Sequence, residues 1–394
     1  MTEVSDMRNI WVLVIFLTST GLHSQSRRIE GTVFEDKNDN GRQDRNEAGI
    51  AGVVVSDQIT TTTTDQQGNY RLTSDGDLPY LFISQPDDYV GTYYYAKEQQ
   101  VNFPLQKSKP QDTFRFIHAS DTHIDSLNLP RMARFREMAD SLAADFIVVS
   151  GDLIRDALRV DDEVAGNYYE MYVSEISKFK MPVYSGVGNH EIFGIERDKS
   201  LVSPKHPLYG KNMYRKYLGP NYYSFNYGGI HFVSIDGVDY QNLYYYGGVD
   251  SVQLAWLEKD VAETPAEVPI VTFNHIPFVS PGFSFRNFEN HIFYGPTLLE
   301  QEGKTEHRHI VYNYDKVKSI IGDRPHPLAL AGHYHAAQEG IIEGSGTMFR
   351  QTSAITRPDQ FMYNGFLVKS GFTLYELKDG KVISSKFVPL NLPD

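Results

Sequence analysis

Residues 145–152 read DFIVVSGD, an apolar run that stops at a glycine and an aspartate. A short run rich in β-branched residues is typical of a strand buried on both faces. Helical stretches are predicted on either side of it, over residues 131–144 and 163–179. The alternation continues with helices over 250–261 and 315–321, between the apolar runs FRFIHAS, MPVYSGVG, IHFVSID, PIVTFNH and LALAGH. This alternation predicts an α/β domain with a largely buried central sheet.

Polar side chains follow five of these runs, at the point where each strand is predicted to end. Because ligands in open α/β sheets bind beyond the carboxyl ends of the strands, we expect these side chains at one rim of one sheet. They are Asp121 and His123 in DTH, Asp152 in GD, Asn189 in GNHE, His275 in NH, and His333 and His335 in GHYH. A glycine precedes several of them, at Gly151, Gly188 and Gly332, and would let the backbone turn where the strand stops.

The seven side chains offer nitrogen and oxygen ligands without sulfur, a set that suits Mn, Zn, Fe or Co. Seven groups are too many for one tetrahedral ion and suit two divalent ions that share a carboxylate. Four positive charges would attract a phosphate, although the chain has a formal net charge of −13. On its own, the pair His333 and His335 leaves open one ion, two ions or none, because positions i and i+2 of an extended chain point to the same side.

Taken together, the series DxH, GD, GNHE, H and GHxH over residues 114–335 resembles the calcineurin-like metallophosphoesterase superfamily. The resemblance implies a metallophosphoesterase fold, an α/β domain whose central β-sheet sandwich is flanked by helices. It also implies that the chain is an enzyme that hydrolyses a phosphate monoester or diester, with attack by a hydroxide that bridges the two metal ions. The implied partner is a small phosphorylated substrate.

The family pattern divides the seven ligands between the two ions. One ion would be held by Asp121, His123, Asp152 and His335, and the other by Asp152, Asn189, His275 and His333. The resemblance thus makes Asp152 the bridging carboxylate, since each of its oxygens can bind one ion.

Other residues of the same blocks have implied roles. His190 would be catalytic together with Asp152, facing the leaving group and oriented by Glu191. Asn189 and Arg155 are candidate contacts for the phosphate. No tyrosine follows Asp152 in LIRDA, so the tyrosine ligand and the Fe(III) charge-transfer site of purple acid phosphatases are not expected.

The N-terminal part of the chain has a different pattern. Residues 27–106 contain short alternating runs between turns and predict a small all-β sandwich domain, which the polar segment 106–112 joins to a phosphoesterase domain over 112–394. The runs GIAGVVV and TTDQQGNYRL resemble bacterial B-repeat-like modules of collagen adhesins. An adhesin-like module leaves a second function open, that of a non-catalytic cell-surface binding protein.

Within this sandwich, residues 36–47 read DKNDNGRQDRNE. The oxygen atoms at positions 1, 3, 5, 7, 9 and 12 have the spacing of a calcium loop. They belong to Asp36, Asn38, Asn40, the carbonyl of Arg42, Asp44 and Glu47. Strands are predicted on both sides, so the loop is not an EF-hand. The alternative is an Asx-rich turn that needs no ion.

The first 25 residues predict a signal peptide, with Arg8 before the apolar run over 10–17. We therefore expect an exported protein, periplasmic or secreted to the cell surface of a bacterium. No transmembrane segment is predicted, and the acidic net charge argues against a nucleic-acid partner. The absence of cysteine excludes disulfides and thiolate metal sites. The oligomeric state is not determined by these features.

The remaining aromatic and histidine residues are harder to assign. Tyrosines are dense over residues 209–246, and residues 281–293 add aromatics and Arg286. Both segments either line a substrate pocket or pack into the core. Histidines outside the five blocks are expected to be core or surface residues of strands (His118 and His231) or loop residues that either contact the substrate or have no role (His206, His291, His307, His309 and His326).

Overall fold

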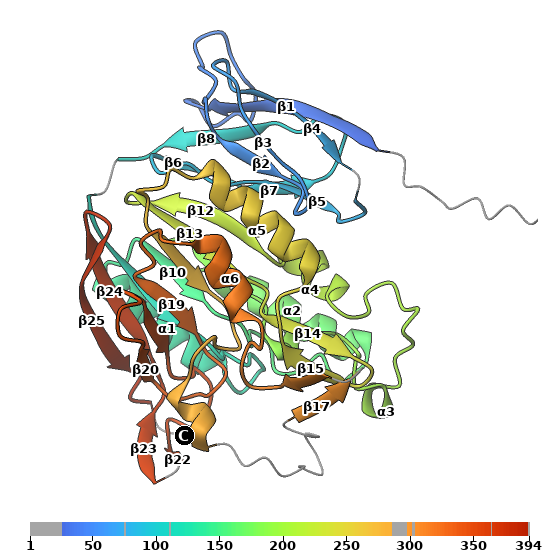
Figure 1. Cartoon of the computed structure of the whole chain (residues 1–394), viewed down its shortest axis with the longest axis vertical. Coiled ribbons are helices and arrows are strands. Elements are labelled where there is room, and N and C mark those ends of the chain that lie inside the picture. The colour runs from blue at the N-terminus through green and yellow to red at the C-terminus, as the bar shows by residue number, and fades with distance from the viewer. Residues whose placement is uncertain are drawn as a thin grey trace, which may run out of the picture.

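The computed structural model describes residues 26–74, 76–109, 112–285, 298–301, 304–363 and 365–392. Figure 1 shows a small β-sandwich at the top and a larger α/β part below it. The predicted signal peptide over residues 1–25 lies outside the described residues, as do Arg286 and the rest of 286–293.

The predicted all-β sandwich consists of two four-stranded sheets. The first has the order β4-β1-β8-β6, with β1 (Arg27–Glu35), β4 (Asn69–Ser74), β6 (Tyr89–Val90) and β8 (Phe103–Lys107). The second has the order β3-β2-β5-β7, with β2 (Val54–Ser56), β3 (Thr61–Thr63), β5 (Tyr80–Ile83) and β7 (Tyr94–Ala96). Every second side chain of β4 is buried, and two of them, Tyr70 and Leu72, pack with Val33 and Phe103 in a core between the sheets.

The α/β part contains two large sheets. One has the order β11-β10-β9-β24-β25, with β9 (Thr113–Ala119), β10 (Phe146–Val149), β11 (Val183–Ser185), β24 (Gly371–Lys378) and β25 (Lys381–Pro389). The other has the order β12-β13-β16-β19-β21-β20, with β12 (Tyr223–Tyr227), β13 (Ile230–Ser234), β16 (Ile270–Phe273), β19 (Leu328–Ala331), β20 (Gln338–Ile341) and β21 (Met348–Gln351). Strands β9, β10 and β11 are parallel, and so are β13, β16, β19 and β21.

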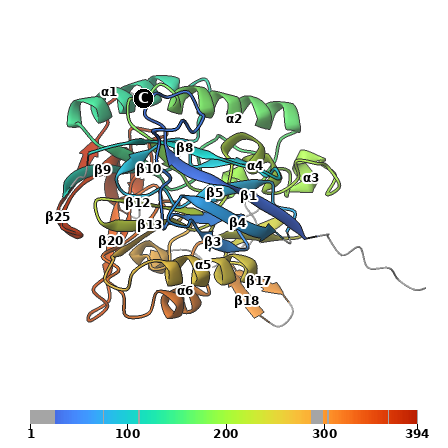
Figure 2. The ribbon, with the colours of Figure 1, turned by 90° about the horizontal axis from the view of Figure 1, so that it is seen from above.

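Four helices cover the outer faces of the two sheets, as Figure 2 shows from above. They are α1 (Leu129–Leu142) and α2 (Asp162–Ile176) on one side, and α5 (Ser251–Glu263) and α6 (Tyr314–Ile321) on the other. Ile147 and Val149 of β10 pack in the core with α1 and α2, whereas Phe146 and Val148 pack in the core with the second sheet. The strand is therefore buried on both faces, and the predicted metallophosphoesterase sandwich flanked by helices is confirmed.

Shorter elements surround this frame. They are α3 (Arg197–Ser200), α4 (Asn212–Leu218), the 3-10 helices η1 (Asn189–Glu191) and η2 (Pro281–Phe285), and the hairpins β14 (Val238–Gln241) to β15 (Tyr244–Gly247), β17 (Leu298–Gln301) to β18 (Lys304–His307) and β22 (Gln360–Tyr363) to β23 (Phe366–Lys369). No helix among the described residues has the length and apolar character that crossing a membrane requires.

The N-terminal sandwich packs directly on the α/β part. The Asp87 carboxylate accepts hydrogen bonds from the backbone N–H groups of Gly228 and Gly229, in the turn between β12 and β13. Phe82 contacts Trp256 of α5, with ring centroids 6.0 Å apart. Gln58 donates to the side chain of Asn221 and to the carbonyl of Tyr222, just before β12, so the sandwich contacts β12 at both of its ends.

Candidate metal centre

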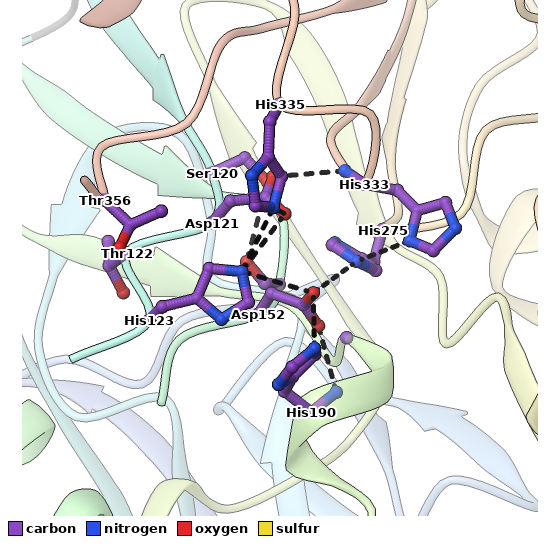
Figure 3. A network of polar contacts seen from close by, with 12 residues as sticks. Ser120, Asp121, Thr122, His123, Asp152, His190, His275, His333, His335 and Thr356 are labelled. Atoms are coloured by element: carbon purple, nitrogen blue, oxygen red, sulfur yellow. Dashed lines mark hydrogen bonds and ion pairs between the residues drawn. The ribbon is translucent and has the colours of Figure 1, made fainter. Parts of the chain in front are cut away.

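The polar residues that follow five strands converge at one rim (Figure 3). Asp121 and His123 follow β9, Asp152 follows β10, Asn189 follows β11, His275 follows β16, and His333 and His335 follow β19. These strands belong to both sheets of the sandwich rather than to one sheet. The centre therefore lies where the carboxyl ends of two sheets meet.

The first donor set consists of Asp121, His123, Asp152 and His335, whose ligand atoms all lie within 4.8 Å of one another. Nε2 of His335 is 3.1 Å from Nε2 of His123 and 3.0 Å from Oδ1 of Asp121. Nε2 of His123 is 3.6 Å from Oδ2 of Asp152. The grouping is the one that the family pattern implies for the first ion.

The second donor set contains Asp152 again, now with His275 and His333. Nε2 of His275 is 3.1 Å from Oδ2 of Asp152 and 3.2 Å from Nδ1 of His333. Among the described residues, Oδ1 of the buried Asn189 has no hydrogen-bond partner. A buried amide oxygen without a partner costs free energy unless a cation or a donor satisfies it.

The spacing of the nitrogens tests whether these residues fit metal ions. Two nitrogens that each lie about 2.0–2.1 Å from one ion are about 2.9–3.4 Å apart, depending on the bond angle. The two N···N distances between histidines, 3.1 Å in the first set and 3.2 Å in the second, fall in this range. The residues fit a binuclear metal site, in which two sets of donors share Asp152.

The backbone at the rim is strained. Five of the seven predicted ligands have a left-handed conformation, with φ of 53° at Asp121, 39° at His123, 49° at Asp152, 70° at His333 and 57° at His335. Each such residue costs about 1–3 kcal/mol and persists only where its surroundings enforce it. His333 and His335 are thus not in extended chain, so the rule that residues i and i+2 point to the same side does not apply to them. The His335 ring belongs to the first donor set and the His333 ring to the second.

Glycines at the rim allow close approach more than turning. Gly151 has φ of 101° and does require glycine for its conformation. Gly188 has φ of −108°, yet a Cβ there would lie 2.1 Å from the backbone nitrogen of Asp152. At Gly332 a Cβ would lie 1.9 Å from Oγ of Ser120. The predicted role of glycine in turning the backbone therefore holds for Gly151. At Gly188 and Gly332, glycine is needed because atoms of Asp152 and Ser120 leave no room for a side chain.

Glu191 is buried below the centre. Its carboxylate accepts hydrogen bonds from the backbone N–H groups of Asp152, Leu153, Ile154 and Gly188, at 2.9, 2.7, 3.2 and 2.6 Å. Glu191 thus holds the segment that carries Asp152, rather than the side chain of His190, its predicted partner.

His190 is oriented by a backbone carbonyl. Its Nδ1 lies 2.7 Å from the carbonyl oxygen of Arg155, which can only accept, so Nδ1 donates. The other nitrogen, Nε2, lies 3.8 Å from Oδ2 of Asp152 and faces the centre. Arg155 itself is exposed, and the contact that it makes with the site is through its backbone.

The electrostatics of the centre follow from burial among opposite charges. Burial lowers the pKa of His275, but the Asp152 and Asp121 carboxylates outweigh burial and raise it to about 9. Burial raises the pKa of Asp152, but the imidazoles around it, His275 first, hold that pKa below its usual range. Burial lowers the pKa of His190. An ion bound by His275 would have to displace this proton, so we expect ion binding to strengthen as pH rises.

One histidine at the centre was not predicted to have a role there. Nδ1 of His309 lies 2.7 Å from Nε2 of His333. The ring of the buried Tyr245, from the tyrosine-rich segment, stands at 89° to that of His333, with centroids 6.3 Å apart. The sequence HRH at 307–309 carries no strand-end signal, so only the fold brings His309 to the site. By contrast, Tyr214 and Tyr223 of the same tyrosine-rich segment are buried in the core.

The predicted calcium loop has a different geometry. Asp36 accepts hydrogen bonds from the N–H groups of Gly41 and Asn40, at 2.7 and 3.2 Å. Glu47 accepts from the N–H groups of Lys37 and Asp44, at 2.9 and 2.8 Å. In the described part of the chain, the clusters in which three or more histidine or carboxylate ligand atoms converge are both at the rim.

Two protein-family models match this chain. Residues 114–337 match the family described as calcineurin-like phosphoesterase, and residues 37–118 match the one described as the N terminal of calcineurin-like phosphoesterase. No curated protein matches the sequence.

Solved structures with a similar arrangement share little sequence. A dimetal phosphatase from Danio rerio is 13% identical, with a TM-score of 0.43 over 71% of this chain and 99% of that one. A purple acid phosphatase from yellow lupin is 13% identical, with a TM-score of 0.41 over 92% of this chain and 69% of that one. The family match covers more than half of the sequence, and the chain belongs to the calcineurin-like phosphoesterase family of metal-binding phosphoester hydrolases.

Proposed function

We propose that the chain is an exported phosphoesterase that hydrolyses a phosphate monoester or diester at two divalent transition-metal ions. The observation that carries the proposal is the pair of donor sets that share Asp152. Asp121, His123 and His335 complete the first set, and Asn189, His275 and His333 the second. When bound, two ions supply Lewis acidity to a phosphoryl group and acidify water.

The residues of the chain act around those ions. Asp152 supplies one carboxylate to both sets and is itself positioned by N–H groups that Glu191 holds. His190 presents Nε2 to the phosphoryl group or leaving group, because its Nδ1 is engaged by the carbonyl of Arg155. Nε2 can donate a proton to the leaving group only when both ring nitrogens are protonated. The exposed Arg155 side chain and the amide of Asn189 are our candidates for contacts with the phosphate.

Substitution of the bridging residue tests this function. Asp152→Asn removes the charge that both ions need, and we expect turnover of p-nitrophenyl phosphate and of bis-p-nitrophenyl phosphate to fall at least ~10³-fold with Mn or Zn present. Metal content should fall from about two ions per chain. Unchanged turnover would overturn the assignment. A wild-type chain that binds no transition ions would favour the non-catalytic binding protein.

The N-terminal part has a supporting role in this proposal. Residues 1–25 would be a signal peptide, and residues 27–106 and 112–394 two domains, with the sandwich as a rigid support for the hydrolase. One calcium ion in the loop of residues 36–47 would stiffen a sandwich that contains no disulfide. N-terminal sequencing of the protein recovered from periplasm and medium tests the export, with cleavage near residue 25 as the expected result.

A further inference from the structure

His309 lies against the outer edge of a predicted ligand. Its Nδ1 is 2.7 Å from Nε2 of His333, and the two rings are stacked with centroids 4.9 Å apart at 30°. The other nitrogen of His333, Nδ1, is 3.2 Å from Nε2 of His275 and faces the donor set. His309 therefore contacts the nitrogen of His333 that points away from the other ligands.

The contact determines which nitrogen of His333 carries the proton. In a neutral imidazole one nitrogen is a donor and the other has the lone pair that a metal ion needs. If Nδ1 of His333 is the ligand atom, Nε2 carries the proton and must donate it to an acceptor. Nδ1 of His309, 2.7 Å away, is an acceptor when the proton of the His309 ring is on Nε2. This hydrogen bond fixes both the tautomer and the ring orientation of His333.

The second histidine of the same donor set shows the same arrangement with a different acceptor. Nδ1 of His275 lies 3.1 Å from the backbone carbonyl of Ser150 and donates to it. The carbonyl of Ser150 directly follows β10, so the sheet fixes its position. The side chain of His309 is not part of a sheet, so other contacts must fix it. His309 can replace such a carbonyl only if its position is fixed.

The segment that carries His309 is fixed on both sides. The hydroxyl of the buried Tyr334, which stands between the two GHYH histidines, donates to the carbonyl of His309 at 2.9 Å. The next residues are tied to the α/β part by Val311 N–H to the carbonyl of Pro277, at 3.0 Å. The guanidinium of the buried Arg308 lies 4.2 Å from the centre of the Tyr245 ring. These contacts hold the histidine ring where His333 meets it.

We infer that His309 is a positioning residue of the second metal site, which presents Nδ1 of His333 to the ion by accepting the hydrogen bond of the Nε2–H group of His333. The inference rests on the proposed function, since it presumes that Asp152, Asn189, His275 and His333 hold one of two ions. It assigns to His309 a part in metal binding that the strand-end residues alone do not supply.

The test is a titration of the metal-free chain with Co²⁺ alone, followed by absorption spectroscopy and by competition with a chelator. In His309→Ala the second ion should bind about 10–100-fold more weakly, while the first is unchanged. His309→Asn should restore the affinity to within a few-fold, because Oδ1 of asparagine takes the place of Nδ1 as an acceptor. His307→Ala, at the end of β18 two residues before His309, is the matched control and should bind both ions as the wild type does.

Each other outcome has a distinct meaning. Unchanged affinity and an unchanged cobalt spectrum in His309→Ala would overturn the inference and leave the proposed function intact. Equal weakening of both ions, not rescued by asparagine, would show a general structural role and overturn it too. If His309→Ala does not fold, His309→Leu keeps the bulk without the acceptor and replaces it in the comparison. A wild-type chain that takes up no Co²⁺ would instead remove the proposed function.

Discussion

The rim of the two sheets and the loop of residues 36–47 both have the residue spacing of an ion site. They differ in whether their polar atoms are already satisfied by hydrogen bonds. At the rim, donor atoms face one another: two pairs of imidazole nitrogens approach within 3.2 Å, and the Asn189 oxygen has no partner in the described part of the chain. In the loop, the Asp36 and Glu47 carboxylates accept N–H groups of the loop itself. The rim therefore needs cations to be satisfied, and the loop does not.

The two regions also differ in how the backbone is held. The rim contains five strained ligand residues, whose conformations are enforced by the packed ends of β9, β10 and β19. The loop has positive φ at Asp39 and Gly41, positions where a turn commonly needs it. Such strain in packed strand ends points to a functional site. In an Asx-rich turn, by contrast, the left-handed conformation costs little free energy, because aspartate and glycine adopt it readily.

Metal removal should have the largest effect and should separate the two regions. Treatment with EDTA strips both, and we expect turnover of p-nitrophenyl phosphate to fall more than ~10³-fold. Adding back Mn or Zn should restore turnover, whereas adding back Ca alone should not. Recovery with Ca alone would contradict the comparison, because it would place the catalytic requirement on a hard, oxygen-preferring ion.

Single histidine substitutions sharpen the division within the rim. His335→Ala should empty the site of Asp121 and His123 first, and His333→Ala the site of Asn189 and His275. A loss of one nitrogen ligand should weaken its own ion by at least ~10²-fold, more than the loss of an outer partner does. Metal content measured against a graded chelator gives the two occupancies. If either variant loses both ions together, the sites are not separate.

Much of the frame and of the rim is predictable from sequence. The apolar runs before Asp121, Asp152 and His275 are strands because each is short, β-branched and bounded by glycine or polar residues. Side chains at strand ends then meet because parallel strands share a carboxyl edge. The sequence does not specify that the strands divide between two sheets, since that depends on which strands pair.

Contacts made through the tertiary fold were not predictable. Glu191 follows His190 in sequence, but its carboxylate accepts hydrogen bonds from three N–H groups in the loop after β10 and from the N–H group of Gly188. His309 reaches His333 across 24 residues, through a segment without periodicity. In both cases the partner is fixed by buried groups that must be satisfied, which a local pattern does not record.

Substitutions of Gly188 at the rim and Gly41 in the loop compare two causes of destabilisation: a steric clash with neighbouring backbone and an unfavourable φ. In Gly188→Ala the new Cβ would lie 2.1 Å from the backbone nitrogen of Asp152, so we expect about 2–3 kcal/mol of destabilisation and reduced turnover. In Gly41→Ala the Cβ meets nothing within 4 Å, and only the positive φ of 71° is unfavourable, at about 1–2 kcal/mol. Denaturant unfolding measures both. Equal losses would mean that the rim can relax around a methyl group.

A control separates strain from other effects in the loop. Gly41→Asn should cost less than Gly41→Ala, because asparagine tolerates the left-handed region better. Turnover should remain that of the wild type in both loop variants, since the carboxylates of the loop bond within the loop and Asp36 N–H bonds to the carbonyl of Leu105 in the same sandwich. Reduced turnover in Gly41→Asn would show that the loop influences the catalytic centre.

The smallest expected effect is that of calcium on the loop. An ion at a hundred times its dissociation constant stabilises the state it binds by about 2.7 kcal/mol, but only if it makes contacts that the ion-free loop lacks. Since Asp36 and Glu47 are already hydrogen-bonded, we expect a rise in Tm of only a few degrees in wild type. Asp36→Asn keeps one acceptor oxygen for the N–H groups and removes the charge, so its Tm should no longer respond to calcium. A wild-type Tm that is the same with and without calcium would make the loop an Asx-rich turn. The loop would then share only the residue spacing of an ion site, whereas the rim also has the geometry of one.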